Sequence, residues 1–324
     1  MRCVVALMLV VILCGGAEAF GDYELKESFE EVLPSKDVNM VSVSTRNGSI
    51  VVDVWDRDEV YVNAEKKVKA RNEEDARKYM EELKVEIRPE GDELEIRTDR
   101  PEWSSGEGFW GRLFGGINGG IQASVSYKIQ VPRRMGLKLN TRNGGIKAEG
   151  TEGRLGASSR NGDLRFRGIG GRVDVETRNG RVELADVAGD LYAESRNGNI
   201  RAEDVAGVVQ HVHTRNGHVR LVNVRGVRKA VTRNGEIYAD LSGSDLEGGY
   251  FETRNSNITL VVPESISATI HAESRSGRVS TDFPIMIQGQ SERGSLHGRI
   301  GSGGPVLTFK TRNGAIRIEK GYGE

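Results

Sequence analysis

The stretch ETRNGRV, Glu176 to Val182, has near copies along almost the whole chain. Each copy holds the tetrapeptide Thr-Arg-Asn-Gly or a close variant of it. The arginines of the ten copies are Arg46, Arg142, Arg160, Arg178, Arg196, Arg215, Arg233, Arg254, Arg275 and Arg312. From Arg142 to Arg233 they recur every 18 or 19 residues. Self-similarity at a nearly fixed period predicts an architecture in which one small unit is stacked many times.

Apolar residues alternate within each unit, as half-buried strands require. Val173 and Val175 precede the motif, whereas Val182 and Leu184 follow it, so the inward positions change parity at Asn-Gly. Because Asn and Gly tolerate positive φ, we expect a sharp corner there with positive φ at glycines such as Gly180. The predicted corner residues are Asn143, Gly144, Asn161, Gly162, Asn179, Gly180, Asn197, Gly198, Asn216, Gly217, Asn234 and Gly235. A second parity slip falls between Leu184 and Val187, so each unit has two short strands and two corners.

Two strands of four or five residues cannot bury a face alone. Stacking the units about 4.8 Å apart pairs each strand with its counterparts above and below. The sequence therefore predicts an all-β fold, a β-solenoid array over residues 136–320. We expect its coils to follow sequence order, with a degenerate copy at Leu296 to Ile300 filling the long gap before Arg312. Gln210 and Arg228 occupy an otherwise apolar column, and we expect a bulge to turn them outward.

The segment before the array has a different pattern. Residues 20–135 are predicted to form a β-rich cap that contains a first coil around Arg46 and one helix at about 72–84. Asn72 is a candidate N-cap, and acidic residues fill the first helical turn. We expect strands at 60–64, 83–87, 94–96 and 125–131. Such a cap would cover the unpaired end of the solenoid.

The first 19 residues have the pattern of a secretory signal: Arg2, an apolar run from Val4 to Leu13, and the small residues Ala17 and Ala19 at a cleavage site. We expect an exported protein that is periplasmic, at the cell surface or secreted. A lipid anchor on Cys14 is less favoured because Leu13 precedes it. No later stretch has 18 consecutive apolar residues, so no integral membrane span is expected after signal removal. With 46 basic and 47 acidic residues, no nucleic-acid partner is expected.

Four features together carry a family resemblance. They are GSIVVDVWDRDEVYV at Gly48, VSYKIQVP at Val125, GSGGPVLTFKTRNGAIRI at Gly301 and the recurring Thr-Arg-Asn-Gly corners. With these the chain resembles the bacterial putative-adhesin family of exported β-solenoid domains, over nearly all of its mature length. The resemblance implies this fold and an extracytoplasmic location. It brings no reaction, ligand or catalytic residue.

The motif arginines are the candidate ligand-binding residues. Thr is inward by parity, so the next residue points outward, and stacking places the arginines in one exposed column. The candidates are Arg142, Arg160, Arg178, Arg196, Arg215 and Arg233. Glutamates two residues earlier could pair with some of these arginines and form an Arg-Glu lattice; they are Glu176, Glu194, Glu252 and Glu273. Where the glutamate is missing, at Arg142, Arg160, Arg215 and Arg233, the column could instead bind an acidic envelope polysaccharide or another envelope protein.

Two other classes of function are alternatives to this structural or adhesive role. A carbohydrate-active β-helix enzyme needs a cleft with clustered carboxylates, whereas Glu183 and Asp186 are scattered over short units, so no catalytic residue is assigned. The second alternative is a periplasmic sensor or scaffold whose partner is another protein.

His211, His213 and His218 lie close in sequence, but solvated surface histidines are favoured over a metal site, and neither metal nor cofactor is expected. The aromatic, glycine-rich loop 102–120 suits a flap better than a sugar platform or membrane foot.

Overall fold

A computed structural model of the chain describes residues 23–100, 121–243, 247–287 and 294–321. The predicted signal at 1–19, with Cys14, and the aromatic loop at 102–120 lie outside these residues. The described chain is mostly β-strand with the helix α1 (Glu73–Glu82), and it divides into two compact units, one ending at Ile146 and the other beginning at Lys147. No helix in the described part combines the length and apolar character needed to cross a bilayer.

The first unit is built from two sets of strands. Its strands are β1 (Tyr23–Pro34), β2 (Met40–Asn47), β3 (Ile50–Trp55), β4 (Glu59–Ala70), β5 (Lys84–Glu90), β6 (Glu93–Asp99), β7 (Gln122–Pro132) and β8 (Gly136–Asn143). β4 lies between β1 and β7 and is antiparallel to both, whereas β2 is parallel to β6 and β8. Val43 of β2 lies opposite Ile96 and Leu139, and all three are fully buried.

The helix of the first unit begins where the sequence predicts. Asn72 Oδ1 accepts a hydrogen bond from the backbone N–H of Asp75 at 2.8 Å, which satisfies one of the free donors at the helix start. Ala76 and Met80 are buried, and the helix packs against β4 and β1. The predicted helix is thus confirmed, with its end at Glu82.

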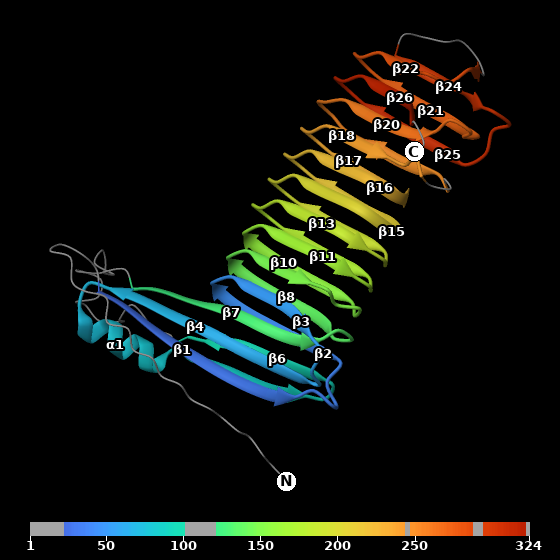
Figure 1. Ribbon diagram of the computed structural model, residues 1–324. Coiled ribbons are helices and arrows are strands. Elements are labelled where there is room, and N and C mark those ends of the chain that lie inside the picture. The colour runs from blue at the N-terminus through green and yellow to red at the C-terminus, as the bar shows by residue number, and fades with distance from the viewer. Residues whose placement is uncertain (1–22, 101–120, 244–246, 288–293, 322–324) are drawn as a thin grey trace. The chain divides into compact units, whose positions relative to one another are not determined.

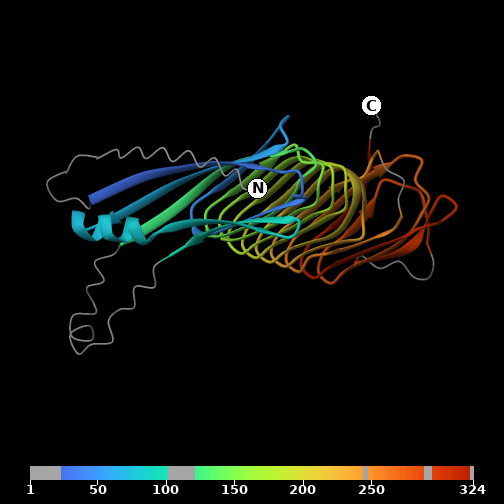
Figure 2. The same cartoon turned by 90° about the horizontal axis from the view of Figure 1, so that it is seen from below.

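The second unit is a stack of parallel coils (Figure 1). Its strands, after β9 (Ile146–Glu149) at the border, are β10 (Leu155–Asn161), β11 (Leu164–Ile169), β12 (Val173–Thr177), β13 (Val182–Val187), β14 (Leu191–Ser195), β15 (Ile200–Thr214), β16 (Val219–Val227), β17 (Lys229–Thr232), β18 (Ile237–Asp240), β19 (Gly249–Glu252), β20 (Ile258–Pro263), β21 (Ala268–Ser274), β22 (Val279–Thr281), β23 (Ile285–Ile287), β24 (Ser295–Ile300), β25 (Val306–Thr311) and β26 (Ile316–Gly321). Figure 2 shows the same coils nested behind one another.

The predicted inward columns are confirmed by the strand register. Ala157 lies opposite Val175, which lies opposite Ala193, on the strands before the motif. On the strands after it, Val182 lies opposite Leu164 and Ile200. These side chains are buried, with at most 6% exposed. The chain is therefore a β-solenoid whose core is a set of apolar columns running along the stack.

The order of the last coils differs from the prediction. β25 pairs with both β19 and β21, and β26 pairs with both β20 and β22, so the coil of Arg312 lies between the coils of Arg254 and Arg275. Figure 1 shows β26 between β20 and β22. Leu296 to Ile300 belongs to β24, which is antiparallel to β21 and β23 and is not a coil. An antiparallel strand here covers the edge that a further parallel coil would have used.

The expected bulge is present in the 19-residue repeat between Arg196 and Arg215. Leu191 lies opposite Val209, but the next residue, Tyr192, lies opposite His211, so Gln210 is the extra residue. Val209 and Val227 are buried and fill the apolar column, whereas Arg228 is exposed. The two polar residues are therefore kept out of the core, as predicted.

Candidate functional site

The threonine or serine of the motif is used inside the stack. Thr177 is buried, and its Oγ1 donates a hydrogen bond to the carbonyl oxygen of Gly162 on the previous coil at 3.1 Å. The same bond runs from Ser195 to Gly180 at 3.0 Å and from Thr232 to Gly217 at 2.9 Å. A buried hydroxyl therefore satisfies the motif glycine's carbonyl, which explains why only Thr or Ser occurs here.

The asparagine of the motif forms a ladder of side-chain amides. Asn179 Nδ2 donates to Asn161 Oδ1 at 2.7 Å, and Asn197 Nδ2 donates to Asn179 Oδ1 at 2.7 Å. The second unit continues this ladder through Asn216, Asn234, Asn255 and Asn313. In the first unit, Asn143 Nδ2 donates to Asn47 Oδ1 at 2.7 Å. Each amide thus serves as donor to one coil and acceptor from the next.

The glycine of the motif has a different role from the one predicted. Gly180 and Gly198 do not have positive φ, so that expectation is wrong. A Cβ atom on Gly180 would overlap the carbonyl oxygen of Gly162, and one on Gly198 would overlap that of Gly180. Gly144, Gly217 and Gly235 meet the coil before them in the same way. At these coils the stacked backbones approach too closely for a side chain, which favours glycine; the coil of Arg254 has Ser256 at this position.

Positive φ occurs instead at the opposite corner. Gly168, Asp186, Asp204 and Asn223 have φ of 64°, 56°, 55° and 52°, and Gly150 precedes them with 81°. These residues fall where the sequence shows its second parity slip, between Leu184 and Val187. Gly, Asp and Asn are the residues that adopt the left-handed conformation most readily, so the identity varies along this column.

The motif arginines are held in register by the backbone. The N–H of Asn179 donates to the carbonyl oxygen of Arg160 at 3.0 Å, and the N–H of Asn197 donates to that of Arg178 at 2.9 Å. The side chains are exposed. Within the described residues, no motif arginine makes an ion pair or a side-chain hydrogen bond. The second unit carries eight of them in spatial order: Arg160, Arg178, Arg196, Arg215, Arg233, Arg254, Arg312 and Arg275. Arg142 lies in the first unit.

The prediction of an Arg-Glu lattice along the motif arginines is wrong. Glu194 Oε1 lies 3.3 Å from His211 Nε2, and Glu252 accepts a hydrogen bond from the Tyr250 hydroxyl at 2.6 Å. Burial and the Glu252 carboxylate raise the pKa of Tyr250 to about 12, so this phenol stays protonated and donates. The lattice does not form because Glu176 lies on β12 whereas Arg178 lies in the bend after it, where strand alternation no longer places the two side chains on one face.

Ion pairs are found instead on the outward face of the strands that follow the motif. Arg165 lies 2.9 Å from Glu183 on the next coil and 2.8 Å from Asp163, and Lys147 lies 2.9 Å from Glu149. Lys147, Glu149, Arg165 and Glu183 line a shallow hollow of about 400 Å³. The second unit therefore has one face on which acids and bases alternate and one corner that carries unpaired positive charge.

A family model described as Toastrack DUF4097 matches residues 38–319. Among solved structures, the chain is similar to one called a putative lipid binding protein from Parabacteroides distasonis, with 12% identity, TM-score 0.48, and 92% of this chain and 97% of that chain covered. It is also similar to one called a putative adhesin from Bacteroides fragilis, with 11% identity, TM-score 0.39, and coverage of 90% and 96%. With identities of 11–12% and TM-scores below 0.5, this similarity to solved structures does not indicate a function. The comparison with curated proteins returned no match.

Proposed function

This chain belongs to the Toastrack DUF4097 family, and from that premise we propose that it is a non-enzymatic β-solenoid module of the cell envelope that binds acidic polysaccharide through its motif arginines. The family resemblance drawn from the sequence is confirmed by the match. One observation carries the proposal. Threonine, asparagine and glycine of the motif all contact the neighbouring coil, whereas the exposed side chain of the arginine makes no ion pair or hydrogen bond with the described residues.

The charge density of the arginine column supports this role. Coils about 4.8 Å apart place one arginine on each coil over eight coils. At that separation two unit charges in water repel by roughly 0.9 kcal/mol before salt screening. A polymer with regularly spaced carboxylate or sulfate groups relieves this repulsion at several coils at once. The interaction is local, because the net charge of the whole chain is −1.

The non-enzymatic part of the proposal rests on the carboxylates of the hollow. Glu149, Glu183 and Glu203 line it, and each has a basic partner in Lys147, Arg165 or Arg201. Carboxylates that form ion pairs with neighbouring basic residues are typical of a structural surface. Acid-base catalysis instead uses one carboxyl group with a raised pKa and a second that stays ionised. The envelope location rests on the signal pattern at 1–19, which lies outside the described residues.

The experiment compares two variants that remove the same charge. Arg160, Arg178, Arg196 and Arg215 are changed to Gln in the first, and Arg165, Arg201, Arg220 and Arg317, which lie outside the motif, are changed to Gln in the second. Binding to a polyuronate and to a neutral glucan of similar length is measured at several salt concentrations. Losing four exposed charge pairs of about 0.5 kcal/mol each should weaken polyuronate binding about thirtyfold in the first variant. We expect the second variant to bind within about threefold of the parent protein.

The proposal also predicts that polyuronate binding weakens steeply as salt is added and that the neutral glucan does not bind. Equal loss in both variants would assign binding to net charge alone. Retention in the first variant, or binding that does not depend on salt, would remove the arginine column from the function. Binding of an envelope protein that is unchanged by the first variant would favour the scaffold alternative instead.

A further inference from the structure

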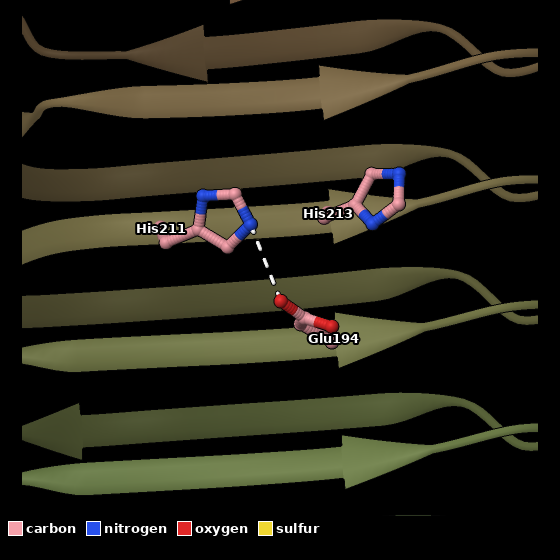
Figure 3. Close-up of side chains that lie close together, drawn as sticks. All are labelled: Glu194, His211 and His213. Atoms are coloured by element: carbon pink, nitrogen blue, oxygen red, sulfur yellow. Dashed lines mark ion pairs between the residues drawn. The ribbon is translucent and has the colours of Figure 1, made fainter.

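The strand register brings two histidines and one glutamate together on the surface of the second unit. His211 and His213 are two residues apart on β15 and so share a face, and Glu194 of β14 lies opposite His213. Figure 3 shows the two imidazole rings on one coil and the carboxylate of Glu194 on the neighbouring coil, which precedes it in the chain. The sequence grouped His218 with these histidines, but His218 Nδ1 accepts a hydrogen bond from the backbone N–H of Glu236 at 3.1 Å. Glu194 takes its place in the cluster.

The distances within this cluster are close to those of a metal centre. Glu194 Oε1 and His211 Nε2 are 3.3 Å apart, and one ligand atom from each of the three residues lies within 4.8 Å of the others. Bonds of about 2.0–2.1 Å to a tetrahedral Zn²⁺ place neighbouring ligand atoms about 3.3 Å apart. One pair already has this separation. We expect rotation of the three side chains to bring the other ligand atoms together, and in Figure 3 a ring nitrogen of His213 lies on the side of Glu194.

We propose that Glu194, His211 and His213 form a binding site for a divalent transition-metal ion, with Zn²⁺ as the ion that best fits the donors. Two imidazoles and one carboxylate are a donor set that holds zinc with three protein ligands. Such a set leaves a fourth position for water or an added ligand. The site is independent of the arginine column, since none of its three ligands is a motif arginine.

The bulge in β15 creates this arrangement. Without the bulge, Tyr192 would lie opposite Gln210, and the two histidines would be displaced by one position relative to β14. A one-residue shift exchanges the two faces of a strand. With the bulge, His211 and His213 point outward while Val209 and Val212 are buried. The 19-residue unit therefore differs from its 18-residue neighbours in presenting two imidazoles beside a carboxylate.

Groups on the two neighbouring coils lie beside this cluster. Lys229 of β17 is the cation next to this group on the following coil, and its charge opposes a bound metal ion. Tyr192 of β14 lies opposite His211 on the preceding coil.

The test uses the purified protein, freed of metal with a chelator and titrated with ZnCl₂ in a calorimeter at about pH 7.5. We expect one Zn²⁺ per chain with a dissociation constant in the micromolar range, on the order of −8 kcal/mol of binding free energy. His211→Asn with His213→Asn should weaken binding at least about thirtyfold, and Glu194→Gln about tenfold. Lys229→Met should tighten binding a few fold because it removes a nearby positive charge.

The chain offers a matched control in a second group of the same residue types. His271 and His297 lie opposite each other on β21 and β24, with His297 Nε2 3.8 Å from Glu273 Oε1. Among the described residues, the cluster at Glu194 alone brings three ligand atoms within 4.8 Å of one another. His271→Asn with His297→Asn should leave the zinc affinity unchanged. Thermal unfolding of each variant checks that it is folded, and added Zn²⁺ should raise the melting temperature of the parent protein but not that of the His211/His213 variant.

Absence of zinc binding by the parent protein would overturn the proposal. Undiminished binding by the folded His211/His213 variant would overturn it as well. Equal losses in the control pair would show that zinc binds histidines without a formed site, which also contradicts it.

Discussion

The two corners of each coil reverse the chain in different ways, and their sequences differ accordingly. At the motif corner, Gly180 has an ordinary φ and is required because the carbonyl of Gly162 leaves no room for a Cβ atom. At the opposite corner, Asp186 turns the chain with a φ of 56°, and Gly168 does so one coil earlier. A Cβ atom on Gly168 would meet Gly150 only at an ordinary contact of 3.6 Å.

This difference explains why the sequence repeat is strong on one side of the coil. Three of the four motif residues contact the coil before them, so most coils repeat them; Ser256 replaces the glycine in one coil and Ser276 the asparagine in another. The opposite corner requires only a left-handed backbone conformation, which Gly, Asp and Asn can each adopt. The motif therefore marks the corner where neighbouring coils contact most closely. Its arginine is the one position that this contact does not determine.

The largest effect is expected from placing the same side chain at the two corners. Gly180→Ala should lower the free energy of unfolding by about 3 kcal/mol, because the clash is with backbone that stacking holds in place. Gly168→Ala should cost about 1 kcal/mol, the strain of a left-handed alanine with space around it. Urea denaturation of both variants measures the difference. Equal losses would show that both corners depend on backbone conformation, and the comparison would fail.

The sequence predicts the columns of the core well, for a physical reason. Alternation of apolar residues is a local signal, and parallel stacking at a constant period repeats it in register, so Val175 and Val182 lie where they are expected. The order of the last coils is not local. The residues around Arg312 do not indicate that its strands lie between those of Arg254 and Arg275, because every coil presents the same columns of apolar side chains to both neighbours.

The site was predictable only in part. Parity correctly places the motif arginines outward, but it continues the strand pattern past its end at Thr177, and so it predicts ion pairs with glutamates that do not form. Asn-Gly is equally compatible with positive φ and with close backbone contact, so the role of Gly180 required the structure. The cluster of Glu194 with His211 depends on pairing across coils at a bulge, which no single segment reveals.

A second effect is expected at the motif hydroxyl. Thr232→Val keeps the shape of the side chain but leaves the carbonyl of Gly217 without its buried donor, which should cost about 1–3 kcal/mol. Thr308→Val, at a partly exposed outward position of β25, serves as the control and should change stability by less than about 0.5 kcal/mol. If the two variants unfold at the same urea concentration, the motif hydroxyl does not hold the coils together.

The asparagine ladder should contribute less, because its amides are exposed. Asn197→Ala removes the bonds to Asn179 and from Asn216 and should cost about 1 kcal/mol. Adding Asn179→Ala should cost less than the sum of the two single changes, since they share one bond. A double-mutant cycle in urea measures this coupling. Strict additivity would mean that the ladder bonds add nothing to the motif corner.

The opposite corner should tolerate changes that relieve its strain. Asp186→Gly is expected to shift the free energy of unfolding by no more than about 1 kcal/mol, because the relief of the left-handed conformation offsets the greater freedom of glycine in the unfolded chain. Asp174→Gly, on strand β12, should destabilise by about 1 kcal/mol, since glycine weakens a strand. A larger loss at Asp186 than at Asp174 would show that the aspartate side chain, and not the backbone conformation, defines this corner.

The most direct test of the account is the stability of the variant in which Arg160, Arg178, Arg196 and Arg215 are all changed to Gln. The account holds that the motif arginines are the residues that stacking does not use. It predicts a free energy of unfolding within about 0.5 kcal/mol of the parent protein's. The urea midpoint should be slightly higher at low salt, because repulsion between neighbouring coils is removed, and unchanged at high salt. A clearly lower midpoint at every salt concentration would show that the arginines hold the coils together, and it would contradict the account.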